Sequence, residues 1–301
     1  MPPSRRTVIR TATASFVASS WSTRTSAAAL PSRRPPPGER RFTSAAVEET
    51  IRDVSSRIGD PELAWLFANC FPNTLDTTVR HGTVGGQPDT FVITGDIEAM
   101  WLRDSCAQVW PYLPLCAQDA PLRTLIAGLI RRQAQCILVD PYANACNFDG
   151  SKPSHWASDE TAMKNELHER KWEIDSLCYP IRLAHGYWKA TNDTSPFDAR
   201  FLEAMDRVIA TFREQQRKQG PGPYKFRRKT KEPTDTLPGD GFGNPTRPCG
   251  LVHAAFRPSD DACVFPYLVP ANFFVVTSMG QLAEIATALG AKPLAAKARA
   301  L

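Results

Sequence analysis

No run of apolar residues in this sequence approaches the roughly 20 residues that a membrane-spanning helix needs. Low-complexity composition is also absent from the chain as a whole, because 42% of its 301 residues are hydrophobic and 22% are charged. These proportions are typical of a globular protein with a substantial core. The sequence therefore excludes an integral membrane protein held by apolar helices and a chain that is disordered throughout.

Acidic residues are missing from the first 38 positions, which contain six arginines. The rest of the chain has 30 basic and 31 acidic side chains, so the formal net charge of +5 arises from this N-terminal segment. A nearly neutral body has no overall field that would attract phosphate groups. We therefore expect no nucleic-acid partner.

The same N-terminal segment is rich in Arg, Ser, Thr, Ala and Pro, a composition typical of an organellar transit peptide. A secretory signal is an alternative, because Arg5-Arg6 precede a mildly apolar stretch. A basic tail with no targeting role is the third possibility. We predict that residues 1–40 form a disordered leader or targeting segment and that residues 41–301 form the folded part.

Common metal and cofactor motifs are also missing. None of the eight cysteines forms a C-x-x-C pair, and the chain has neither an H-E-x-x-H nor a G-x-S-x-G motif. Residues 239–243 superficially resemble a phosphate-binding loop but lack the preceding strand and the following helix that such a loop requires. The sequence predicts no metal site and no cofactor.

Apolar residues recur at helical spacing through most of the body, whereas only residues 90–94 favour a strand. We expect an all-α fold of paired helices around a common axis, with long loops between them. The basic cluster between residues 225 and 231 is predicted to be a solvated part of such a loop. The clearest helices are expected near residues 51–67, 121–130, 172–190, 197–212 and 271–289.

Carboxylates stand beside aromatic residues and arginines in four segments: residues 95–105, 154–160, 172–175 and 256–261. A sugar site needs this mixture, because aromatic faces stack on a pyranose ring and charged groups bind its hydroxyls. Two further carboxyls can supply the acid and the base for glycoside hydrolysis. These segments indicate a carbohydrate site.

Simpler structural roles are possible for several of these residues. Asp260 and Asp261 could share a proton near an arginine, but spacing alone favours Ser259 or Asp260 as the cap of a helix that begins near Asp261. Glu173 and Asp175 are two positions apart, so one helix would not place both on the same face. Arg103 and Asp104 could form an internal ion pair, and Trp101 could be a core residue.

The same segments, in the same order, resemble glycoside hydrolase family 125, from Asn73–Val79 and Asp89–Ser105 to Phe256–Cys263. The resemblance runs from about residue 48 to the end of the chain. It implies an (α/α)6 barrel and an exo-acting α-mannosidase that removes terminal α-1,6-linked mannose with inversion, without a metal. The implied partner is a mannose-containing oligosaccharide or glycan.

The resemblance also implies site residues. The general acid of the family corresponds to Asp260 or Asp261, and Arg103 and Asp104 belong to the clamp for the terminal sugar. Weaker candidates for the pocket wall are Trp101, Trp156, Glu173, Asp175, His253 and Arg257.

Family members continue well beyond the position of Leu301, and their general base lies in that later part. We therefore expect residues 41–301 to be the N-terminal two thirds of an incomplete barrel, with little activity by themselves. A non-catalytic mannoside-binding protein and a glycosidase for another sugar remain alternatives.

Overall fold

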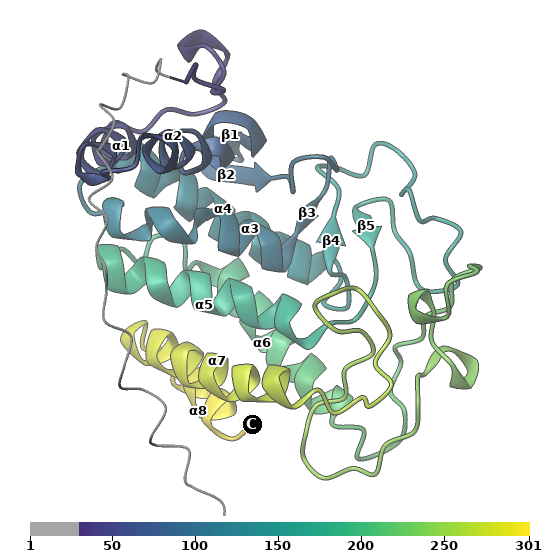
Figure 1. The fold of residues 1–301 in the computed structure, drawn as a ribbon. Coiled ribbons are helices and arrows are strands. Elements are labelled where there is room, and N and C mark those ends of the chain that lie inside the picture. Colours follow the sequence, from purple (N-terminus) through teal and green to yellow (C-terminus); the bar gives the residue numbers. More distant parts are fainter. Residues whose placement is uncertain (1–29) are drawn as a thin grey trace, which may run out of the picture. The chain divides into compact units, whose positions relative to one another are not determined.

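The computed structural model describes residues 30–301 (Figure 1). Most of the predicted leader, residues 1–29, lies outside the described residues. The chain divides into Met1–Pro31 and Ser32–Leu301, and the architecture below is that of the second unit.

The boundary of the folded body lies at Ser32 rather than after residue 40. Arg34 explains the difference, because its guanidinium contacts Asp76 at 2.7 Å and Glu48 at 2.5 Å. Asp76 is almost completely buried and needs a cationic partner. The short 3-10 helix Pro37–Glu39 follows, so residues 32–40 belong to the body and not to the leader.

Two short helices, α1 (Ala45–Arg57) and α2 (Pro61–Cys70), begin the body. Ser44 caps α1 by accepting a hydrogen bond from the backbone N–H of Val47. Asp60 caps α2 in the same way. Two polar residues therefore define where these predicted helices start.

A π-helical turn at Thr74–Thr78 leads into an antiparallel hairpin of β1 (Val79–Val84) and β2 (Gln87–Val92). The predicted strand at residues 90–94 overlaps the second half of β2. Its partner β1 was not predicted, because Arg80, His81 and Gly82 do not alternate with apolar residues.

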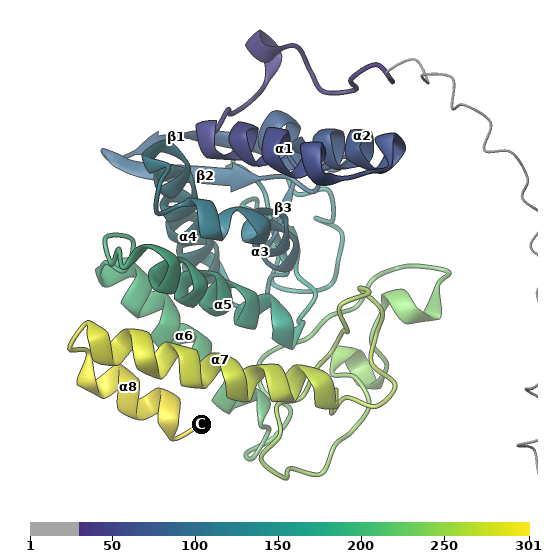
Figure 2. The ribbon, with the colours of Figure 1, turned by 60° about the vertical axis from the view of Figure 1, so that its left-hand side comes forward.

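Six further helices lie in two rows, with α3, α5 and α7 in one row and α4, α6 and α8 in the other (Figures 1 and 2). Neighbours within each row contact one another, and the chain passes from one row to the other at every connection. The fold is therefore mainly helical with a few short strands. The helices span Leu102–Val109 (α3), Ala120–Val139 (α4), Ile174–Thr191 (α5), Ala199–Gln215 (α6), Val269–Ala288 (α7) and Lys292–Arg299 (α8).

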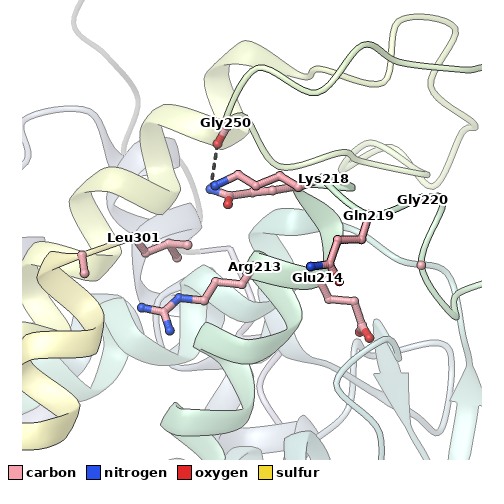
Figure 3. A pocket seen from close by; sticks show the side chains of 10 residues that line it. Arg213, Glu214, Lys218, Gln219, Gly220, Gly250 and Leu301 are labelled. Carbon is pink, nitrogen blue, oxygen red and sulfur yellow. Dashed lines mark hydrogen bonds between the residues drawn. The ribbon is translucent and has the colours of Figure 1, made fainter.

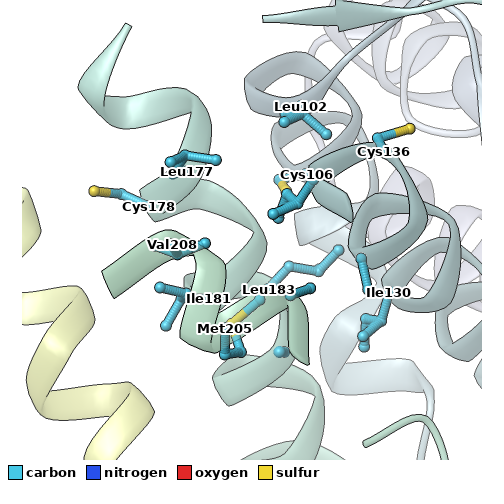
Figure 4. Packing of buried hydrophobic residues seen from close by; sticks show 14 of the residues in the cluster. Leu102, Cys106, Ile130, Cys136, Leu177, Cys178, Ile181, Leu183, Met205 and Val208 are labelled. Atoms are coloured by element: carbon cyan, nitrogen blue, oxygen red, sulfur yellow. The ribbon is translucent and has the colours of Figure 1, made fainter. Parts of the chain in front are cut away.

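Apolar side chains fill the space between the rows (Figure 4). Leu102 and Cys106 of α3 and Leu177 of α5 lie in the same buried cluster as Met205 and Val208 of α6. Burying one such leucine contributes about 1.5–3 kcal/mol. The periodicity that predicted helices near residues 121, 172, 197 and 271 is thus the pattern of core-facing positions, and these helices are confirmed.

The loops gather at one end of α3, α5 and α7 (Figure 1). Three short strands lie there in an antiparallel sheet of order β3-β4-β5, formed by Met100–Trp101, Ala145–Cys146 and Leu167–Glu169. β3 runs directly into α3, and β5 is followed by α5 within a few residues. All four sugar-site segments predicted from the sequence therefore lie around this end of the helices.

A substitution at Gly128 tests the contact between α4 and the hairpin. A Cβ at this position would lie 2.6 Å from Thr90 Oγ1 and 3.0 Å from the Asp89 backbone. We expect Gly128→Ala to lower the free energy of unfolding by about 1–3 kcal/mol through overpacking. Urea unfolding followed by circular dichroism measures the change.

Gly280 in α7 is the matched control, because a Cβ there would meet nothing within 4 Å. Gly280→Ala should raise the free energy of unfolding by up to about 1 kcal/mol through better helix propensity. Similar effects of the two substitutions would contradict the close approach of α4 and β2.

Candidate active site

A pocket of about 530 Å³ opens among the loops at this end of the helices. Trp101, Trp156 and Asp260, all predicted from the sequence, line it. Ile97 and several charged or aromatic residues that were not individual site candidates also line it. Three of these lie within the predicted segments (Asp96, Glu98 and His155), and the others are His168, Glu169, Lys171, Arg228 and Asp235.

Asp260 and Asp261 lie in a tight loop closed by an antiparallel bridge between Phe256 and Ala262. No helix begins at this point of the described chain, so the helix-cap interpretation is wrong. The Asp261 carboxylate accepts hydrogen bonds from Ser259 Oγ at 2.7 Å and from Arg257 Nη2 at 2.9 Å. These bonds lower the pKa of Asp261. Asp261 is therefore held as a carboxylate within its own loop.

The Asp260 carboxyl takes a different direction from that of its neighbour. Its Oδ1 lies 3.4 Å from Arg103 Nη2, and the side chain reaches the pocket. The backbone of Asp260 is left-handed, with φ of 65°. That conformation is unfavourable for a residue with a Cβ and separates the side chains of the two aspartates.

Arg103, in the first turn of α3, is surrounded by carboxyl groups. Its Nη1 lies 2.6 Å from Glu173 Oε2 and 3.4 Å from Asp175 Oδ2, and its Nε lies 3.5 Å from Asp104 Oδ2. Burial acts against the charged guanidinium, but these carboxyls outweigh it and raise the pKa of Arg103. A permanent cation therefore lies beside Asp260.

The orientation of Glu173 and Asp175 corrects the prediction that they face different ways. Glu173 is the residue before α5 and has extended backbone (φ −121°, ψ 128°), whereas Asp175 is helical. The helical spacing argument does not apply to such a pair, and both side chains contact Arg103. Both are buried, and burial raises the pKa of each. They support Arg103 from behind and do not line the pocket.

Arg228 occupies a second charged cluster and is the exception to the predicted solvated basic loop, whose other basic residues are exposed. Its guanidinium lies 2.6 Å from Asp159, 2.9 Å from Glu169 and 3.0 Å from Asp235. It also covers one face of the Trp156 ring at 3.5 Å from the ring centroid. Arg228 is buried because these carboxylates compensate its charge.

Lys171 connects the second cluster to Asp260. Its Nζ lies 2.5 Å from Asp235 Oδ1 and donates to the backbone carbonyl of Asp260 at 2.9 Å. Burial disfavours the charged form of Asp235, but hydrogen bonds and charge from Lys171 and Arg228 outweigh it and lower the pKa of this carboxyl.

Four rings form a wall of the pocket. The Trp101 and His168 centroids are 5.1 Å apart, those of His168 and His155 are 6.0 Å apart, and those of His155 and Trp156 are 4.8 Å apart. All four line the pocket. Such a wall suits the apolar face of a sugar ring.

His253 and Arg257 are not part of this wall. His253 is completely buried, its backbone bonds to Gln215 and Trp172, and burial lowers its pKa to about 4. It is a structural residue, so the prediction that it lines the pocket is wrong. Arg257 extends into solvent and pairs with Asp261, and Asp104 lies beside Arg103.

Sequence reasoning missed Lys171, Arg228, Asp235, His155 and His168 as pocket residues. The sequence offered only an indirect indication of their role. Each lies in the basic loop, or in or next to a segment that supports the family resemblance. Each is joined to its charged or aromatic partners by tertiary contacts that no local pattern reveals.

A larger hollow of about 870 Å³ lies elsewhere, between the end of α6 and Leu301 (Figure 3). Its lining includes Arg213, Glu214 and Lys218 but no aromatic ring, and Glu214 is the one acidic side chain. It lacks the groups that a sugar site needs. The loop pocket is therefore the better candidate.

Among residues 30–301, no cluster of histidine, cysteine and acidic side chains has the geometry to hold a metal ion. In the same part of the chain, no helix is long and apolar enough to span a membrane.

The sequence profile of one family, described as metal-independent α-mannosidases of glycoside hydrolase family 125, matches residues 60–301. The chain belongs to this family. The family resemblance noted from the motifs is thus confirmed, and the family is one of glycosidases.

Two relatives within this family are similar to the chain over most of its length. It is 41% identical over 280 residues to the meiotically up-regulated gene 157 protein of Schizosaccharomyces pombe, covering 87% of this chain and 55% of that protein. It is 42% identical to a Streptococcus pneumoniae metal-independent α-mannosidase solved in a non-productive complex with α-1,6-mannobiose. That structure matches with a TM-score of 0.81, over 86% of this chain and 61% of the other. The chain spans less than two thirds of either relative.

Substitutions at Arg228 and at its neighbour Arg227 test how much the buried cluster contributes to stability. Arg228→Met would leave Asp159 and Glu169 buried without this cation, so we expect a loss of about 3–5 kcal/mol in the free energy of unfolding. Arg227 makes an exposed pair with Glu160, and Arg227→Met should cost less than about 1 kcal/mol. Equal losses in urea unfolding would show that the Arg228 cluster contributes no more than a surface ion pair.

Proposed function

We propose that this family 125 chain belongs to an exo-acting enzyme that removes terminal α-1,6-linked mannose from oligosaccharides or glycans. The observation that carries the proposal is the position of Asp260, which reaches a pocket walled by aromatic rings while its neighbour Asp261 is tied within the loop. The α-1,6-mannobiose bound by the Streptococcus pneumoniae relative supports the linkage.

Asp260 is the proposed general acid. Protonated, it would deliver its proton to the glycosidic oxygen as the bond to the terminal mannose breaks. Asp261 is unsuited to this role, because its hydrogen bonds favour the ionised form and it does not line the pocket. These contacts favour Asp260 in the choice that the sequence left open.

Inversion requires a second carboxylate that activates water on the opposite face of the sugar. The family resemblance assigns this base to the part of family members that follows the position of Leu301. We also propose that the two rows of helices form part of an (α/α)6 barrel, since three successive helix pairs alternate between the rows.

The proposed sugar clamp consists of Arg103, Asp104 and the ring wall that includes Trp101 and Trp156. Arg103 contacts the pocket residue Asp260, but neither Arg103 nor Asp104 lines the pocket itself. Arg103 has donors for vicinal hydroxyls, and Asp104 is a partly exposed acceptor beside it. Glu173 and Asp175 are buried and contact Arg103, and the Glu173 carboxyl also meets the Asp260 carboxyl, so they act on the sugar through these two residues.

A mannoside-binding role without catalysis is the second candidate. It is supported by the ring wall of the pocket, which suits a bound sugar whether or not hydrolysis follows. The clamp and the ring wall need no base to bind a sugar.

Proton NMR of α-1,6-mannobiose incubated with the 301-residue chain separates the two candidates. If the chain is the enzyme, β-mannose appears before α-mannose, because inversion precedes mutarotation. Saturation-transfer signals from mannobiose without turnover would favour the binding role. Neither binding nor turnover in a folded sample would refute the proposed substrate.

Single substitutions separate the two aspartates. Asp260→Asn should lower the rate on mannobiose by about 10²- to 10⁴-fold, the usual contribution of a general acid. The loss should be much smaller on an aryl mannoside whose leaving group needs no protonation. Asp261→Asn should affect both substrates alike and weakly, and the reverse pattern would reassign the acid.

A further inference from the structure

Lys171 lies where three segments meet next to Asp260. It precedes α5, faces the short helix Pro233–Asp235 and contacts the loop that carries both aspartates. We propose that Lys171 is a positioning residue, which orients the Asp260 carboxyl by holding the backbone of Asp260. The proposal rests on the proposed function of Asp260 and adds a residue that acts through it.

Lys171 and its neighbour Trp172 contact both ends of the loop that carries Asp260. The backbone N–H of Phe256 donates to the carbonyl of Trp172 at 3.0 Å, which places the start of the loop beside Lys171. The Lys171 side chain is 4% exposed, and its Nζ lies 5.2 Å from the centroid of the Phe256 ring. One ammonium group thus binds the Asp260 carbonyl and Asp235 in a site with little access to water.

Asp260 needs such a restraint. Its left-handed backbone is less favourable for a residue with a Cβ than for glycine, although aspartate tolerates it better than most residues. The Asp260 N–H donates to the Arg257 carbonyl at 2.8 Å, and Lys171 binds the carbonyl of Asp260. The Asp260 carboxyl meets Arg103 at 3.4 Å, a weak hydrogen bond, and the buried Glu173 carboxyl, so its direction depends on these side chains and on the backbone that Lys171 binds.

Removing the ammonium should leave the fold intact. Asp235 and Glu169, the acidic partners of Lys171, both also contact Arg228. Neither carboxylate would be left without a cation. A substitution at Lys171 can therefore change the loop without the loss of stability expected for Arg228.

Lys171→Met removes the ammonium and keeps the length of the side chain, while Lys171→Arg keeps a cationic donor. Lys164→Met is the matched control, because Lys164 Nζ also donates to a backbone carbonyl, that of Val139, outside the pocket. The first readout is amide hydrogen exchange over residues 257–263. The second is the ¹³C NMR signal of the Asp260 carboxyl, assigned by its loss in Asp260→Asn.

We expect Lys171→Met to raise exchange in residues 257–263 roughly ten- to a hundredfold, the effect of losing one charged hydrogen bond. Exchange in α4 should stay unchanged, and the Asp260 carboxyl signal should shift. Lys171→Arg should show exchange rates and an Asp260 carboxyl signal close to those of the wild type. Lys164→Met should match the wild type in both. A lysine that only contributed to stability would raise exchange throughout the core.

Wild-type exchange and an unmoved Asp260 signal in Lys171→Met would overturn the proposal. If Lys171→Met does not fold, Lys171→Gln, which keeps one donor for the carbonyl, takes its place in the same comparison. α-1,6-Mannobiose added to the wild-type chain tests the proposed function separately. Absence of mannobiose binding would refute that function, while the exchange and carboxyl readouts would still decide the role of Lys171.

Discussion

The partly buried guanidinium of Arg103 is the constraint on which the arrangement of the site depends. It comes from the start of α3 and meets carboxyls from the start of α5 and from the loop before α7. A buried charge without partners costs several kcal/mol, so these three segments are stable only when they lie together. The relative positions of α3, α5 and the Asp260 loop are therefore coupled through one side chain.

A second cluster extends the same principle to the loops. Arg228 and Lys171 share the carboxylates of Asp235 and Glu169, so the long loop after α6 is tied to β5 and to the segment before α5. Charges of opposite sign are nearly balanced in this region. The loops that form the pocket are thus held by ion pairs, whereas the helices beneath them are held by apolar packing.

The sequence by itself determined most of the helices and the family. Helices α4 to α7 could be predicted because an apolar stripe with helical period is a local pattern, and the family was recognisable from ordered motifs. Tertiary structure alone decided that Glu173 and Asp175 face one guanidinium and that Arg228 is buried. It also decided that His253 is completely buried outside the pocket lining and that Asp260 reaches the pocket. These outcomes depend on the backbone angles of single residues and on ion pairs between residues 50 or more positions apart, and neither leaves a periodic trace in the sequence.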